Sequence, residues 1–189
     1  MAGRDVGQLT RAMIDGGVDI IQVRAKESSP GQLVQLALAV IGVAYRHGVP
    51  VIINDDIDVA ITTGADGIHL GQEDWATVAK DKLTAIRIIG ISTHSLEQAR
   101  QAEHDGAHYI GVGPVFATGT KPNVKPVGLE LVKQVADQIT IPFFAIGGIT
   151  AQNLREVKAA GAKRVAVVSA ILKPTEVQQA TQNIKERLL

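Results

Sequence analysis

Short apolar runs alternate with longer amphipathic segments along the whole chain. The apolar runs are short and often β-branched, and such continuous runs are typical of strands buried on both faces of a parallel sheet. They predict strands at residues 18–23, 49–53, 67–70, 87–91, 108–112, 141–146 and 164–168.

The segments between these runs carry apolar residues at helical spacing, and several end at a glycine, which is a common helix stop. They predict helices at residues 31–47, 56–63, 75–82, 95–105, 128–138, 151–160 and 175–188. A further helix, at residues 6–15, comes before the first strand. Strands that alternate with helices in this way indicate βαβ units.

The number of units indicates the fold. A (β/α)8 TIM barrel has eight strands, each followed by a helix. This chain offers seven strands and eight helices, and the strand expected before the helix at 6–15 is missing. We therefore predict a single α/β domain over residues 1–189, a (β/α)8 TIM barrel that lacks its first strand. The alternative is a complete open sheet that begins with a helix.

Composition and charge exclude several classes of protein. The chain has 189 residues, 46% of them apolar and 20% charged, which indicates a globular domain. The 19 basic residues balance 19 acidic ones, so no overall field favours nucleic acid or an anionic membrane as a partner. The absence of cysteine excludes disulfides, thiolate metal sites and a cysteine nucleophile. No signal peptide or membrane-spanning run is evident, so we expect a cytoplasmic location.

The first predicted strand carries a polar face. Because side chains of a strand alternate, Gln22, Arg24 and Lys26 point the same way, into the predicted barrel and toward its C-terminal mouth. Two cations and an amide at this spacing suit a phosphate or diphosphate. The alternative is an ion pair within the protein, because a buried Arg24 without a counter-charge would be costly.

Acidic residues follow the next two strands. Asp55 and Asp56 come after the strand at 49–53, and Asp74 follows the strand at 67–70. Barrel enzymes place their active sites at these strand ends, where Asp55 and Asp74 could bind Mg²⁺ together with substrate phosphate oxygens. Helix capping is the alternative: we expect it for Asp56, and for Asp74 both interpretations stand.

Ser92 ends the fourth predicted strand, and Ser95 is placed to cap the helix that follows. A serine nucleophile needs an adjacent base and an orienting partner, and the local sequence identifies neither for Ser92. We interpret His94 as a structural histidine.

The longest loop, residues 113–127, contains Thr118, Thr120 and Lys121. Two hydroxyl groups and an ammonium group could close over an anion, although a plain surface loop explains them equally well.

Gly147-Gly148 and Val168-Ser169 follow the last two predicted strands. In many barrels the loops after these strands bind phosphate through backbone N–H groups. Glycine lets the backbone approach the ligand closely, and a serine hydroxyl adds a donor.

A series of short motifs runs through the chain in a recognisable order. They are Gln22-Val23-Arg24-Ala25-Lys26, Asn54-Asp55-Asp56, His69-Leu70-Gly71-Gln72-Glu73-Asp74, Gly90-Ile91-Ser92, Gly113-Pro114-Val115-Phe116, Thr118-Gly119-Thr120-Lys121-Pro122, Ala145-Ile146-Gly147-Gly148-Ile149 and Val167-Val168-Ser169-Ala170-Ile171. Over residues 6–189 this set resembles the thiamine-phosphate synthase family. Family members normally begin with an apolar strand before the helix that corresponds to 6–15.

The resemblance implies a transferase that joins 4-amino-5-hydroxymethyl-2-methylpyrimidine diphosphate to a thiazole phosphate, giving thiamine phosphate and pyrophosphate. It implies that Mg²⁺ is bound by Asp55 and Asp74. By matching motif, the pyrimidine diphosphate would be bound by Gln22, Arg24, Lys26, Asn54, Ser92 and Lys121, with Arg24, Ser92 and Lys121 as the catalytic residues. The thiazole phosphate would be bound by Thr118, Thr120, Gly148, Val168 and Ser169. The expected partners are these small molecules, and a homo-oligomer is left open.

Two other functions remain as alternatives. A thiazole tautomerase of the same superfamily would need neither the Arg24 and Lys26 pair nor both aspartates, and it would carry a histidine in place of Pro114. The second alternative is a phosphate-ligand binder without activity, because an open seven-stranded barrel exposes two sheet edges. Turnover of the two substrates distinguishes this case from the synthase.

Overall fold

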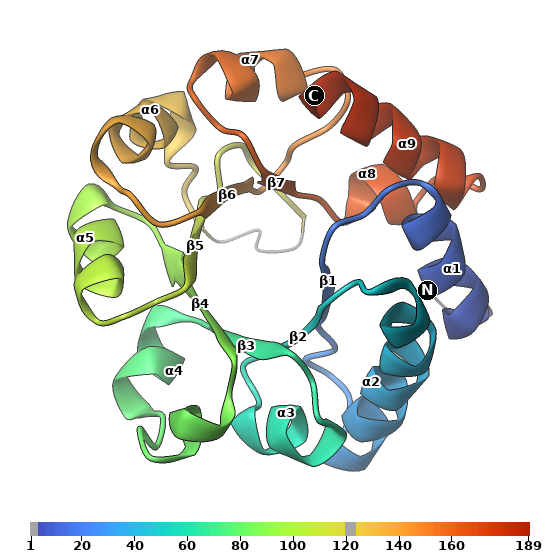
Figure 1. Ribbon diagram of the computed structural model, residues 1–189. Coiled ribbons are helices and arrows are strands. Elements are labelled where there is room, and N and C mark those ends of the chain that lie inside the picture. The colour runs from blue at the N-terminus through green and yellow to red at the C-terminus, as the bar shows by residue number, and fades with distance from the viewer. Residues whose placement is uncertain (1–3, 120–123) are drawn as a thin grey trace.

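The computed structural model describes residues 4–119 and 124–189, in which seven parallel strands curve around a common interior with the helices outside (Figure 1). The strands are β1 Ile21–Val23, β2 Val51–Asn54, β3 Gly67–Leu70, β4 Ile88–Thr93, β5 Tyr109–Val112, β6 Phe143–Ile146 and β7 Val165–Ala166. They pair in chain order, and each overlaps its predicted run. The predicted α/β class and the parallel order are confirmed.

The helices are α1 Val6–Asp15, α2 Pro30–Ala44, α3 Ile57–Thr63, α4 Gln72–Thr77, α5 Leu96–His104, α6 Gly128–Gln138, α7 Leu154–Ala159, α8 Ser169–Leu172 and α9 Val177–Leu188, with 3₁₀ turns η1 Tyr45–His47 and η2 Lys82–Ala85. The predicted helix at 75–82 is wrong in its bounds. The chain enters α4 directly after Gly71, and the extended backbone of Val78 ends it. The prediction of eight helices also missed α8, which we had interpreted as a turn.

Side-chain caps explain where several helices begin. The Asp56 carboxylate accepts a hydrogen bond of 2.9 Å from the backbone three residues on, and the Ser95 hydroxyl accepts one of 3.2 Å in the same way. Both predicted caps are confirmed. At α2, Ser29 and Gln32 form a reciprocal capping box, with a proline at the first helical position.

Strand side chains alternate between the helix layer and the interior of the sheet. The outward side chains are buried and apolar and pack in two clusters with the helices; they include Val51, Ile53, Ile68, Leu70, Ile91, Ile110 and Val112. The alternate, inward positions mix polar residues, glycines and apolar residues; they include Gln22, Asn54, Gly67, His69, Gly90, Ser92, Tyr109 and Gly111, and also Ile52, Ile88 and Phe144. The interior is therefore polar only in part.

Gly90 and Tyr109 lie opposite each other in neighbouring strands β4 and β5. A Cβ atom at Gly90 would lie 2.1 Å from Cζ of Tyr109, so only glycine leaves room for this ring. The ring also packs edge-on against Phe144, with 5.3 Å between ring centroids. The missing side chain on β4 is thus what allows a large aromatic residue inside the sheet.

The sheet has two edges in the described residues, because β1 and β7 each pair with one strand only. On the outside, α1 packs against both α2 and α9, so the helix layer continues where the strands do not pair (Figure 1). No helix in the described part of the chain is long and apolar enough to cross a membrane.

Candidate active site

A charged cluster lies at the C-terminal ends of β1, β2 and β3. Lys26 Nζ is 3.0 Å from Oδ2 of Asp55, which directly follows β2. Asp55 has φ of 67°, a backbone conformation that few non-glycine residues adopt, although aspartate tolerates it better than most. Its N–H donates to the carbonyl oxygen of His69 at 2.9 Å, which fixes this turn against β3.

Asp74 lies in the first turn of α4, and its side chain hydrogen bonds to Asp55. Burial raises the pKa of the Asp74 carboxyl, and the neighbouring Asp55 carboxylate raises it further. A backbone hydrogen bond from Gly71, the residue before α4, and the charge of Lys26 oppose this rise. Asp74 therefore lies inside α4, whose N-cap is Gly71, and its side chain faces a second carboxylate.

Two carboxylates in contact form a site that a divalent cation would stabilise. Within residues 4–119 and 124–189, no third aspartate, glutamate or histidine lies close enough to Asp55 and Asp74 to bind the same metal ion. Mg²⁺ is usually held by one or two carboxylates together with substrate phosphates and water. The donor set therefore fits magnesium better than a closed structural metal site.

The expected anion-binding face of the first strand is only partly formed by β1. Gln22 is exposed between the buried Ile21 and Val23, as strand alternation requires. Arg24 follows the last residue of β1 and is exposed, so the costly burial of an unpaired guanidinium group does not arise. Its charge stays hydrated and needs no counter-ion within the protein.

The sequence did not reveal the role of His69, which points from β3 into the interior. Its Nε2 lies 2.8 Å from Oγ of Ser92 on β4, and its Nδ1 lies 2.9 Å from the hydroxyl of Tyr109 on β5. Gln72 Nε2 donates to the Ser92 carbonyl oxygen at 2.6 Å. Ser92 thus has the neighbouring imidazole that its local sequence lacks. The sequence carried no signal for this contact, because only the pairing of β3 with β4 places His69 beside Ser92.

His94 is held by the protein in the way that a structural histidine would be. Its ring Nδ1 hydrogen bonds with the carbonyl oxygen of Gly113, and its backbone N–H donates to Oε1 of Gln98 at 2.7 Å. These contacts join the end of β4 to the loop after β5 and to α5.

The glycine turn after β6 packs against the loop after β5. Gly147 and Gly148 have φ of 103° and 63°, which favour glycine. A Cβ atom at Gly148 would lie 2.6 Å from the carbonyl oxygen of Ala117, and Phe116 N–H donates to the Gly147 carbonyl at 3.1 Å. Asn153 Nδ2 holds the Gly148 carbonyl at 2.9 Å. The glycines therefore permit this close contact between two loops.

The remaining predicted residues are placed less completely. Val168 and Ser169 are exposed at the start of α8, two and three residues after β7, and Thr118 is half-buried in the loop after β5. Thr120 and Lys121 lie outside the described residues. Asn54 ends β2 in register with His69.

Apart from Gln22 in β1 and Ser92 in β4, the described candidates end or follow strands of a parallel sheet, so they share one side of the molecule. Within that side, the structure joins Lys26 to Asp55 and Asp74, and Ser92 to His69.

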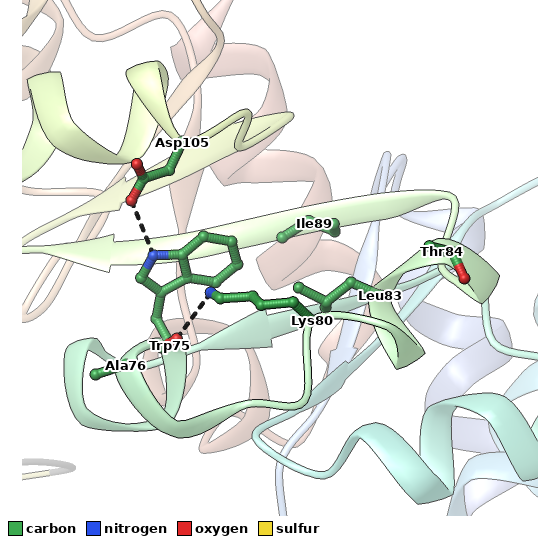
Figure 2. Close-up of a pocket in the computed structure, with 7 residues that line it drawn as sticks. All are labelled: Trp75, Ala76, Lys80, Leu83, Thr84, Ile89 and Asp105. Carbon is green, nitrogen blue, oxygen red and sulfur yellow. Dashed lines mark hydrogen bonds between the residues drawn. The ribbon is translucent and has the colours of Figure 1, made fainter.

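A hollow of about 650 Å³ lies between α4, η2 and the end of α5 (Figure 2). Trp75 Nε1 donates to Asp105 at 3.1 Å, and Lys80 Nζ lies 3.1 Å from the centroid of the Trp75 ring. Burial lowers the pKa of Lys80, and the hydrogen bond from Trp75 lowers that of Asp105. These polar groups bind one another, so the hollow does not extend the strand-end site.

The chain matches known proteins over most of its length. The family model described as thiamine monophosphate synthase matches residues 1–171. The thiamine-phosphate synthase of Shouchella clausii (strain KSM-K16) is 45% identical over 182 aligned residues, which cover 95% of this chain and 87% of that protein. That of Chloroflexus aurantiacus (strain ATCC 29366 / DSM 635 / J-10-fl) is 40% identical over 189 aligned residues, covering 97% and 88% respectively.

A solved structure agrees with these sequence relatives. Thiamine phosphate pyrophosphorylase from Pyrococcus furiosus superposes with a TM-score of 0.88 at 32% identity, covering 98% of this chain and 90% of that one. Sequence and structure therefore agree that the chain belongs to the thiamine monophosphate synthase family.

Proposed function

We propose that this protein is a transferase that condenses 4-amino-5-hydroxymethyl-2-methylpyrimidine diphosphate with thiazole phosphate. The bond between the pyrimidine methylene carbon and the diphosphate oxygen breaks, and its electron pair leaves with pyrophosphate. The lone pair of the thiazole nitrogen forms the new C–N bond of thiamine phosphate. The observation that carries the proposal is the cluster of Lys26, Asp55 and Asp74 at the strand ends of a protein of this family.

Magnesium is the proposed cofactor, with Asp55 and Asp74 as its protein ligands. When bound, it would offset the charge that builds on the departing diphosphate. Lys26 lies within 3.0 Å of Asp55, so its ammonium group is available to the same diphosphate. The exposed Arg24 supplies a second cation at the mouth of β1, where a guanidinium can bind phosphate oxygens in a bidentate manner.

The two substrates occupy different parts of the strand ends in this proposal. The pyrimidine diphosphate is bound by Gln22, Arg24, Lys26, Asn54, Ser92 and Lys121. The thiazole phosphate is bound by Thr118, Thr120, Gly148, Val168 and Ser169. The contact between the Gly148 turn and the loop after β5 supports the second group, because it joins two of its segments.

The proposed function also implies a closed barrel. We infer that the sheet is that of a TIM barrel, in which the position between β1 and β7 belongs to an eighth strand. Both edge strands are parallel to their neighbours, and α1 and α9 already pack together outside this position.

The test is turnover by the purified chain. With both substrates and Mg²⁺, we expect formation of thiamine phosphate and pyrophosphate, and we expect excess EDTA to abolish it. Asp55→Asn and Asp74→Asn should each remove most of the activity. Asp58→Asn is the matched control, because Asp58 is an exposed aspartate on α3 that pairs with Lys82. Full activity in EDTA would contradict the metal assignment, and no product under any condition would contradict the function.

A further inference from the structure

A chain of hydrogen bonds lies inside the sheet, beneath the strand-end site. His69 bridges Ser92 and Tyr109 through its two ring nitrogens, at 2.8 and 2.9 Å. His69 and Tyr109 are each 7% exposed, whereas Ser92 is half-buried. Gln22 also hydrogen bonds to Tyr109. Four side chains from β1, β3, β4 and β5 are thus connected across the interior.

The order of donors along this chain depends on the tautomer of His69, because each ring nitrogen either donates or accepts a hydrogen bond. If the Tyr109 hydroxyl donates to Nδ1 of His69, this nitrogen carries no proton. A neutral imidazole that accepts at Nδ1 carries its proton on Nε2.

We propose that His69 is a positioning residue: its Nε2–H donates to Ser92 Oγ and thereby directs the Ser92 hydroxyl proton toward acceptor atoms of the bound pyrimidine diphosphate. This inference rests on the proposed function. Within the described residues, the bond to His69 is the hydrogen bond of Ser92 Oγ, so the hydroxyl proton remains for a ligand. In the opposite tautomer Ser92 would donate to His69 and present only lone pairs, which an anion would repel.

The surroundings of His69 hold the ring in place. A Cβ atom at Gly111 would lie 3.2 Å from Cε1 of His69, so the neighbouring strand approaches the ring closely. On the other side, the ring centroid lies 5.4 Å from that of Tyr109. The carbonyl oxygen of Ser92 is fixed by Gln72 at 2.6 Å. Because these contacts fix the ring, the position of the proton on the imidazole determines the direction of the Ser92 hydroxyl proton.

Nitrogen NMR of the chain labelled with ¹⁵N-histidine reads this proton position without any substrate. The chain has five histidines, and the His69→Gln variant identifies the signals of His69. We expect a pyridine-type nitrogen at Nδ1 and a protonated nitrogen at Nε2. Tyr109→Phe, which removes the donor to Nδ1, should shift the balance between the tautomers. A neutral ring with its proton on Nδ1 would overturn the proposal.

Ligand binding tests the consequence for Ser92. The amide of His69→Gln can place an N–H near the former Nε2, whereas His69→Leu cannot. We expect His69→Leu to weaken binding of the pyrimidine diphosphate about tenfold, the size of one hydrogen bond, and His69→Gln to weaken it less. Binding of thiazole phosphate should change in neither variant. Equal losses for both ligands would show a merely structural role and overturn the proposal.

The Ser92→Ala background provides the decisive comparison. If His69 acts through Ser92, then His69→Gln and His69→Leu should bind the diphosphate equally well once Ser92 is alanine. A difference that persists in this background would overturn the inference. A wild-type chain that shows the expected tautomer but binds no pyrimidine diphosphate would refute the proposed function and the substrate step here, while supporting the order of hydrogen bonds.

Discussion

The carboxyl group of Asp74 keeps its proton to a higher pH in the folded protein than in the unfolded chain, because burial and Asp55 both disfavour its charged form. The contribution of Asp74 to stability therefore falls as the pH rises from about 4, the ordinary aspartate value, through the raised value. In metal-free buffer, Asp74→Asn should raise the melting temperature at pH 7 by roughly one or two degrees, because solvent screens most of the interaction at this partly exposed carboxyl group. At about pH 3, where both states are protonated, the effect should nearly vanish.

Circular dichroism during heating measures this effect. The control is again Asp58→Asn, which removes an exposed aspartate with a cationic partner and should not stabilise the chain at neutral pH. A lower melting temperature for Asp74→Asn at pH 7 would mean that the charged carboxylate stabilises the fold, against our prediction.

The fit between Gly90 and Tyr109 gives a second prediction for a single residue. Gly90→Ala places a methyl group where the Tyr109 ring lies, so the ring or the strand must move. We expect a loss of about 1–3 kcal/mol in the free energy of unfolding, the usual cost of overpacking a core. Gly42→Ala is the control, because Gly42 lies in α2 with no atom within 4 Å of the new Cβ. There alanine should stabilise the helix by up to about 1 kcal/mol.

Urea unfolding of the two alanine variants compares them directly. Equal stabilities would show that the interior can accommodate a side chain on β4, and would remove our explanation for the glycine.

Residues whose partners are local could be predicted from the sequence, and those with distant partners could not. The caps at Asp56 and Ser95 bind the backbone three residues away. His69 binds Ser92 and Tyr109, which are 23 and 40 positions further along the chain. Only the register of three strands brings these side chains together, and the sequence pattern does not specify that register to the residue.

At the scale of the element, periodicity predicted the strands well and the short helices poorly. Each strand is an apolar run buried against helices, so burial alone largely determines its sequence pattern. In contrast, α4 and α8 have six and four residues, too few for a helical period to show. Their starts depend on the turns that follow β3 and β7, and those turns contain the candidate site residues Asp74 and Ser169.

The capping box of α2 gives the prediction at this scale. Ser29 and Gln32 satisfy each other's backbone N–H groups at the start of the 15-residue helix. Ser29→Ala should lower the free energy of unfolding by about 1 kcal/mol, while activity per folded molecule stays unchanged. The control is Ser28→Ala, one residue earlier and outside the box. Equal stability of the two variants in urea would show that α2 does not depend on its cap.

For the whole molecule, the parallel order is what makes the site predictable. Parallel strands all end on one side of the sheet, so Lys26, Asp55 and Asp74 could be expected to meet before any geometry was known. Whether the sheet closes is a different matter, because closure depends on pairing between β1 and β7 or on a strand between them. The alternation of apolar and polar positions does not report on that pairing.

The two sheet edges allow a prediction about closure. In the described residues, β1 and β7 each have one paired side, which leaves backbone N–H and C=O groups available on the other. A short apolar strand joined ahead of residue 1 should pair with both edges and cover part of the interior. Each apolar side chain buried in this way contributes about 1.5–3 kcal/mol at most, so we expect the melting temperature to rise by several degrees. Hydrogen exchange should slow at the amides of β1 and β7.

The control is a segment of the same length with prolines at alternate positions, which cannot donate the ladder hydrogen bonds. Identical melting and exchange for the two extended chains would show that these edges do not accept a strand, and the inference of an eighth strand position would then be wrong.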